Sequence, residues 1–221
     1  MLKQLLADYC RKTYFGNNPQ PVKIGVYRPS VLSWSCVRRQ WNYYKELSGK
    51  KPEEIPDDLV LLLSGGIVFH RLIQSFKEDG KPYWSATEVE CSIEVEVAGG
   101  QKIKIVGHAD AIKGKGIEKT VYEFKHVRSL PSNAYFQHIL QLNFYMGAMG
   151  ITRGVLLYVG YLSNGGLAVR EFPRLYSDWH MEHLITRAQT LHTLLVNNQA
   201  PRCSCKDKKC EMTNQIYDTG A

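Results

Sequence analysis

Four cysteines, one early and three late in the chain, constrain the fold more than any other feature of the sequence. Cys36 stands near the start, and the other three lie near the end, at Cys203, Cys205 and Cys210. If all four bind one metal centre, segments far apart in the sequence must meet in the fold. We expect the chain to be cytoplasmic, where thiols stay reduced, so metal binding is a better expectation than disulfides.

Zinc and iron–sulfur clusters both accept four thiolates. Structural zinc sites usually contain paired C-x₂₋₄-C knuckles. Three clustered cysteines with a distant fourth are closer to the ferredoxin type of arrangement. The single residue between Cys203 and Cys205 lets both bind one iron, which favours a 2Fe–2S centre over a 4Fe–4S cluster but leaves the type open. A domain stabilised by zinc remains an alternative.

The composition is typical of a globular protein and favours a polyanionic partner. A chain of 221 residues, 44% of them hydrophobic and 22% charged, suits a single domain over 1–221. Its 28 Lys and Arg against 21 Asp and Glu give a net charge of +7, as in many proteins that bind nucleic acid. The start lacks the apolar segment of a signal peptide, and we expect no membrane association.

The hydrophobic pattern predicts five strands. Apolar and polar residues alternate over 88–97, which indicates a half-buried strand. Glycine turns lead into strands over 102–112 and 120–127, so these three form an antiparallel meander. Two further strands, over 154–161 and 167–172, are joined by an Asn-Gly-Gly turn. Cys91 alternates with the apolar residues of the first strand and is predicted to be a core residue.

Helices are predicted between these strands and on either side of them. One runs from about Ser30 through Tyr44, and a second ends near Lys77 after starting at Asp57 or, because paired glycines weaken it, at Gly66. Helical spacing also marks residues from about 133 to 149 and from 177 to 197. The sequence therefore predicts an α/β fold in which a central mixed β-sheet is flanked by helices.

Two carboxylates and a lysine lie on neighbouring predicted strands. Glu123 and Lys125 project from the same strand face, and Asp110 reaches that patch if the preceding strand pairs antiparallel. Two carboxylates hold Mg²⁺ or Mn²⁺ well and leave positions for water and phosphate. Such an ion polarises a phosphodiester, and Lys125 adds positive charge. The same residues on a solvated strand would form only a surface salt bridge.

Three polar residues spaced four apart form a stripe on the helix that follows, at Gln137, Gln141 and Tyr145. Their neutral donors suit phosphate oxygens and bases. His70 lies in an otherwise apolar segment of the second helix. It is either a hydrogen-bonded core residue or, beside a carboxylate site, a third metal ligand.

Basic residues surround the cysteines. They are Arg38, Arg39, Arg202, Lys206, Lys208 and Lys209. Such a cluster predicts a surface that faces DNA, with a merely solvated tail as the alternative.

The order of these motifs resembles a known family, the CRISPR-associated RecB-like exonucleases. They form the fourth numbered Cas protein family, within the PD-(D/E)xK nuclease superfamily. The matching residues, which span most of the chain, are Gly66-x-x-x-His70, Gly107-His-Ala-Asp110, Glu123-Phe-Lys125, Gln141-x-x-x-Tyr145 and the one early and three late cysteines. Members commonly space the last cysteines as C-x₂-C and then further on, whereas the gaps here are one and four residues, so 2Fe–2S and 4Fe–4S clusters are both alternatives.

The resemblance implies a restriction-endonuclease-like core and Mn²⁺- or Mg²⁺-dependent cleavage of DNA, chiefly exonucleolytic on single strands. It implies a catalytic core over about 57–197 and a cluster region formed by about 29–48 and 200–215. In the family this activity helps to prepare CRISPR spacers with the integrase subunits. Carried over to this chain, the metal ligands are His70, Asp110, Glu123 and the Phe124 carbonyl, the catalytic residues are Lys125, Gln141 and Tyr145, and the iron–sulfur ligands are Cys36, Cys203, Cys205 and Cys210.

A second hypothesis is a non-catalytic iron–sulfur subunit that holds DNA within a repair or integration complex. The intact carboxylate, lysine and glutamine pattern argues against it, because a site without catalytic function need not keep all of these residues. The sequence leaves open whether the chain belongs to a CRISPR locus or to a related repair or viral nuclease.

Overall fold

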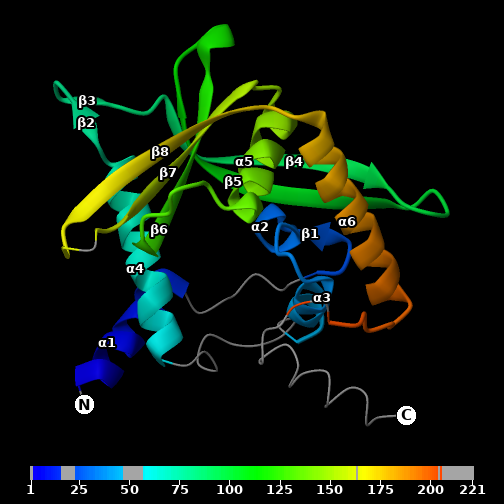
Figure 1. Ribbon diagram of the computed structural model, residues 1–221. Coiled ribbons are helices and arrows are strands. Elements are labelled where there is room, and N and C mark those ends of the chain that lie inside the picture. Colours follow the sequence, from blue (N-terminus) through cyan, green and yellow to red (C-terminus); the bar gives the residue numbers. More distant parts are fainter. Residues whose placement is uncertain (1, 16–22, 47–56, 163, 204, 206–221) are drawn as a thin grey trace.

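The computed structural model describes residues 2–15, 23–46, 57–162, 164–203 and 205 (Figure 1). Its main sheet has six strands: β1 (Val26–Tyr27), β4 (Ala86–Glu96), β5 (Lys102–Lys113), β6 (Thr120–Ser129), β7 (Arg153–Tyr161) and β8 (Leu167–Leu175). The α-helices are α1 (Leu2–Cys10), α2 (Pro29–Leu32), α3 (Val37–Glu46), α4 (Asp57–Gln74), α5 (Phe136–Met149) and α6 (Asp178–Val196). Shorter elements are a π-helical turn (Arg11–Phe15), the hairpin of β2 (Lys77–Glu78) and β3 (Lys81–Pro82), and a 3₁₀ turn (Gly116–Glu118).

The main sheet is mixed, as the sequence predicts. Its strands follow the order β1-β5-β6-β7-β8, and β4 also pairs with β5. β1 runs parallel to β5 and β6 parallel to β7, whereas the β4–β5, β5–β6 and β7–β8 pairs are antiparallel. Helix α5 connects the parallel strands β6 and β7, which need such a crossover. The predicted α/β fold, a central mixed sheet flanked by helices, is confirmed.

One edge of β5 is shared between two short pairings. β1 pairs with residues 104–105, and β6 pairs with residues 111–113. Between them, residues 106–110 have no strand partner on that edge within the described part of the chain. The Gly-His-Ala-Asp sequence at 107–110 lies in this gap.

Apolar side chains cover both faces of the sheet. On one face, residues of α5 and α6 such as Leu140 and Leu191 pack in the larger core with Val121 and Leu156. On the other face, Phe69 and Ile73 of α4 pack on a smaller cluster that contains Phe124 and Leu157. Consecutive residues of β6 and β7 therefore face opposite helices, which is the alternation expected of a strand covered on both sides.

Segments outside the core contact each other and α4. In Figure 1 the chain that follows α6 runs back to α3. Helix α1 packs on α4 through Ala7, Cys10 and Val60, and Arg11 forms an ion pair of 2.6 Å with Asp57. No helix in the described ranges is long and apolar enough to cross a membrane.

Two helix predictions need correction. The predicted helix from Ser30 through Tyr44 is divided, because α2 ends at Leu32 and α3 begins only at Val37. The Gln40 side-chain amide donates to the carbonyls of Leu32 and Trp34, which stabilises the break. Cys36 therefore precedes α3 and is not helical. Helix α4 begins at Asp57 and runs through both glycines, so the alternative start at Gly66 is wrong.

Candidate active site and cysteine centre

Asp110 and Glu123 face each other where β5 and β6 diverge. The last ladder pair joins Ala111 to Tyr122, so the next two residues oppose one another across the opening. The Phe124 backbone N–H donates to Asp110 Oδ2 at 2.6 Å. The carboxylate thus satisfies a buried donor that has lost its place in the ladder. The strand divergence holds both carboxylates in one small region, as the sequence predicts.

Lys125 connects the carboxylate site to helix α5. Its Nζ donates to Glu123 Oε1 at 2.6 Å and to Gln141 Oε1 at 2.8 Å. Gln141 Nε2 in turn donates to the Tyr145 hydroxyl at 3.0 Å. Burial raises the pKa of Tyr145 well above its usual value, and the nearby Glu123 carboxylate adds to the effect. The hydroxyl therefore keeps its proton at neutral pH.

His70 reaches Asp110 from α4. Its Nδ1 lies 3.2 Å from Asp110 Oδ1. Burial alone would lower the pKa of His70, but the hydrogen bond and charge of Asp110, with a smaller contribution from Glu123, outweigh burial and raise it. Nδ1 is therefore the ring nitrogen that faces the carboxylates, and once deprotonated it is the one that could share an ion with Asp110.

The chemistry of these donors fits a divalent cation. Glu123 is only 2% exposed, and its Oε2 atom has no hydrogen-bond partner among the described residues. Burial, reinforced by the Asp110 charge and opposed by Lys125, raises the pKa of Glu123 to about 8. An uncompensated buried carboxylate oxygen is costly, and a bound cation would satisfy it. The donor atoms of His70, Asp110 and Glu123 do not all lie within 4.8 Å of one another, so binding would draw them closer.

Two residues that the sequence analysis did not select also contact this site. Gln74 Nε2 donates to the Asp110 carbonyl at 3.1 Å and also contacts Glu88. Glu88 lies between the paired residues Thr87 and Val89 of β4 and has a φ of 51°, in the left-handed region that non-glycine residues rarely adopt. Gln74 follows His70 by four residues, so helical spacing could have identified it; no sequence signal marks the backbone of Glu88.

A third such residue, His138, lies on α5 near the lysine. Its Nδ1 is 2.8 Å from the Tyr158 hydroxyl. Burial, with a smaller effect from the Lys125 charge, lowers the pKa of His138 to about 3. The imidazole is therefore neutral in the folded protein. Its position follows from the packing of α5 on β7, which the local sequence does not reveal.

A cavity of about 960 Å³ opens beside the site, over the gap in the edge of β5. Tyr145 and Gly107 line it together with Arg28 and His108. A Cβ atom on Gly107 would lie 2.8 Å from Pro29 Cγ and 2.9 Å from Tyr145 Cε1. Glycine is therefore required at this position for the ring of Tyr145 to pack against β5.

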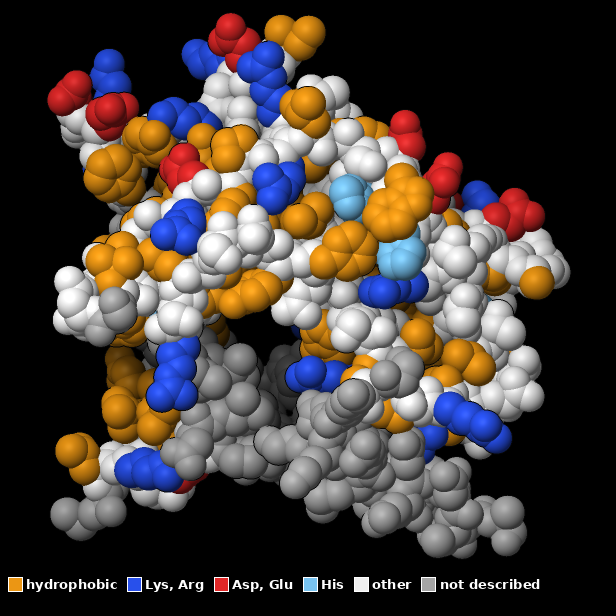
Figure 2. Space-filling model, viewed as in Figure 1, with side chains coloured by type: hydrophobic (Ala, Val, Ile, Leu, Met, Phe, Trp, Pro, Cys, Tyr) orange, Lys and Arg blue, Asp and Glu red, His pale blue; other side chains and the backbone are white. Residues whose placement is uncertain are grey.

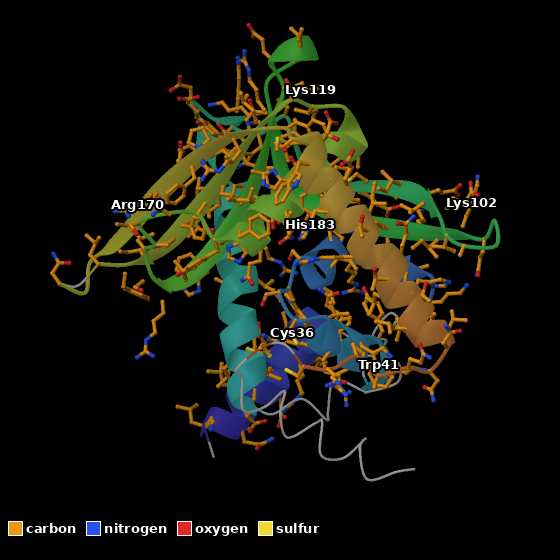
Figure 3. All side chains as sticks on the ribbon, turned by 45° about the vertical axis from the view of Figure 1, so that its right-hand side comes forward. Cys36, Trp41, Lys102, Lys119, Arg170 and His183 are labelled. Carbon is orange, nitrogen blue, oxygen red and sulfur yellow. The ribbon has the colours of Figure 1, made fainter. Side chains whose placement is uncertain are left out.

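Three of the four predicted cluster cysteines converge. The Sγ atom of Cys203 lies 3.7 Å from that of Cys36 and 3.2 Å from that of Cys205, and the three fall within 4.8 Å of one another. Figure 3 labels Cys36. Their chemistry fits zinc or an iron–sulfur cluster, both of which bind thiolates. Cys210, the predicted fourth ligand, lies outside the described residues. The remote Cys91 is buried in the main core, as predicted.

The basic residues near the cysteines differ in exposure. Arg38 is 2% exposed and donates to the Pro201 carbonyl at 3.1 Å, so it ties α3 to the returning chain and offers DNA little surface. Arg39 is exposed, with its guanidinium over the Trp34 ring. The three lysines that were also predicted to contact DNA lie outside the described residues: Lys206, Lys208 and Lys209.

The sequence matches no protein-family model and no curated protein. The fold is similar to the crystal structure of SSO0001, with a TM-score of 0.65 and 21% identity over 88% of this chain and 86% of that chain. A more distant likeness is to LHK-Exo, an alkaline exonuclease from Laribacter hongkongensis crystallised in complex with dAMP. Its TM-score is 0.43 at 13% identity, over 90% of this chain and 96% of that chain. The likeness to SSO0001 shows a shared fold.

The Glu123 carboxyl should make the stability of the metal-free protein depend on pH. Its pKa is higher in the folded state, so its stabilising contribution is complete below about pH 4.5 and is lost as the pH rises towards about 8. In metal-depleted buffer, Tm measured by calorimetry should fall over this range, and Glu123→Gln should flatten the fall. Equal slopes for the two proteins would contradict a buried, protonated Glu123.

The converging thiols should hold a metal that joins the two ends of the fold. Cys205→Ala should remove bound metal, measured by elemental analysis, and lower Tm, because the chain after α6 would no longer be linked to Cys36. Cys91→Ala is the control, since it removes a thiol in the main core without touching the centre. Brown protein with visible absorption would indicate iron–sulfur, and colourless protein with zinc would select the alternative. Full metal content in Cys205→Ala would refute this ligand set.

Proposed function

We propose that this protein is a metal-dependent DNA nuclease that hydrolyses phosphodiester bonds where β5 and β6 diverge. The observation that carries the proposal is the buried Glu123 carboxylate. One of its oxygens is bound by Lys125, and the other has no partner among the described residues. Asp110 lies directly across the strand opening, so two carboxylates and the Lys125 ammonium share one site. Two carboxylates beside a lysine suit phosphodiester hydrolysis. The alternative, a surface ion pair, would be solvated, whereas Glu123 is buried.

Asp110, Glu123 and His70 would hold a Mg²⁺ or Mn²⁺ ion, with the Phe124 carbonyl as a further ligand. When bound, such an ion lowers the pKa of a coordinated water and stabilises charge on the phosphate. The Phe124 N–H and His70 Nδ1 each contact one oxygen of the Asp110 carboxylate. These contacts fix its orientation before the ion binds, which reduces the reorganisation that binding requires.

Lys125 would stabilise the negative charge that develops on the phosphate and help to orient the attacking water. Its ammonium is held between Glu123 and Gln141, so its position depends on both strand and helix. Gln141 accepts from Lys125 and donates to the Tyr145 hydroxyl, whose own proton remains available for an acceptor such as a phosphate oxygen. Gln141 and Tyr145 of α5 thus place neutral hydrogen-bonding groups beside the Lys125 ammonium.

The finer parts of this proposal rest on the family resemblance. They are exonuclease action chiefly on single-stranded DNA, an iron–sulfur centre at the cysteines, and a role in CRISPR spacer acquisition with integrase subunits. The net charge of +7 supports a nucleic-acid partner of some kind. The cavity beside Tyr145, lined in part by Arg28 and His108, offers room for a strand next to the centre.

Cleavage of single-stranded DNA labelled separately at its 5′ and 3′ ends tests the proposal. In Mn²⁺ the wild type should degrade it, and Asp110→Asn and Lys125→Met should each reduce the rate by at least about 100-fold, because each removes a charge that stabilises the transition state. EDTA should abolish cleavage. The order in which the two labels are released gives the polarity.

Glu94→Gln provides a matched control, because Glu94 is an exposed carboxylate of β4 that pairs only with Lys102 among the described residues. It should cleave like the wild type. Salt-sensitive DNA binding without cleavage in Mn²⁺ would instead support the non-catalytic subunit. Wild-type rates in Asp110→Asn would show that chemistry occurs elsewhere.

A further inference from the structure

Exposed aromatic rings gather where α5 and α6 begin. Trp179 is 59% exposed and Phe136 is 45% exposed, and their ring centroids lie 6.1 Å apart. The His183 ring stacks on Trp179 at 5.5 Å with an interplanar angle of 12°, and it also contacts Phe136. Figure 2 shows histidine and apolar side chains together over this part of the molecule, and Figure 3 labels His183 on α6. We call Phe136, Trp179 and His183 the aromatic platform.

A cavity of about 320 Å³ adjoins the platform through Phe136. Tyr135, Gln137 and Arg187 line it, together with Ser33 and Ser35. Arg187 is held in place because its Nη1 donates to the carbonyls at the end of α2, including that of Leu32 at 3.2 Å. No acidic residue is among the described residues that line the cavity. Ser33 already donates its hydroxyl proton to the Ser30 carbonyl. The Arg187 guanidinium and the Ser35 hydroxyl are therefore the groups that suit an anion such as a phosphate.

Helix α5 carries residues of both this cavity and the candidate active site. Gln137 lines the cavity, and Gln141, which accepts from Lys125, lies one turn further along the helix. One turn of four residues advances about 6 Å. Tyr145, one turn beyond Gln141, lines the larger cavity. The stripe thus runs from the exposed Gln137 beside the aromatic platform to the buried Gln141, which contacts Lys125.

We infer that the aromatic platform binds the unpaired bases of a nucleic-acid strand, whose backbone follows the Gln137–Gln141 stripe towards Lys125. Rings with an exposed face stack on bases of any sequence, and a cation nearby neutralises the backbone. Bases within a duplex are already stacked and paired, so the platform favours single strands. This inference rests on the proposed function for the direction of the strand, although binding itself requires no cleavage.

The test measures binding in EDTA at fixed salt, by fluorescence anisotropy of a labelled dT oligomer. Trp179→Ala should weaken binding about 10-fold through loss of base stacking. Trp179→Phe, which keeps a ring, should recover most of the affinity. An abasic oligomer and a blunt duplex should bind the wild type and Trp179→Ala equally. Phe76→Ala is the matched control, because Phe76 is also a half-exposed ring that contacts another aromatic ring, Tyr83.

Several results would overturn the inference. Unchanged dT affinity in Trp179→Ala would show that the rings do not contact bases. An equal loss for the abasic oligomer would show that the effect is not stacking. If Trp179→Ala instead dissociated an oligomer in sedimentation, the platform would be a contact between copies of the chain. The binding test is run in EDTA and needs no cleavage. Absence of nuclease activity in the separate cleavage assay would therefore refute the proposed function and leave the binding result standing.

Discussion

The hydrogen bond from the Phe124 backbone N–H to the Asp110 carboxylate is the interaction on which the site depends. Where β5 and β6 part, backbone groups lose their ladder partners, and an unpaired buried N–H is costly. Asp110 supplies the missing acceptor at 2.6 Å. The carboxylate therefore stabilises the opening between the strands and, by the same contact, is held opposite Glu123. Asp110 is therefore needed both to satisfy the Phe124 N–H and to form the pair of carboxylates.

The opening also explains why two helices from opposite faces of the sheet meet there. Helix α4 brings His70 to one oxygen of Asp110, and α5 brings Gln141 to Lys125. A continuous ladder would separate these two faces. At the gap in the edge of β5, the ring of Tyr145 packs against Gly107, where a Cβ atom would clash with it. Within the Gly-His-Ala-Asp sequence, packing therefore constrains Gly107, and contacts with Phe124 and His70 hold Asp110.

Local pattern was sufficient to predict the elements that carry the site. The alternation around Cys91 marked β4, and the two-residue spacing of Glu123 and Lys125 placed both on one face, where the structure finds them in contact. Long-range contacts determined what was missed. The two-residue strand β1 exists only through its pairing with β5, and the break after α2 depends on carbonyl contacts from Gln40 and from the distant Arg187. No local pattern carries that information.

An anomalous difference map from crystals soaked in Mn²⁺ would show whether the carboxylates bind a metal. We expect one strong peak at the strand opening, from an ion bound by Asp110 and by the Glu123 oxygen that has no partner within the described structure. The peak should be absent in Glu123→Gln while the fold is retained. An ion bound only elsewhere, or an empty site with Glu123 unchanged at a pH above its pKa, would contradict the claim that these carboxylates form a metal centre.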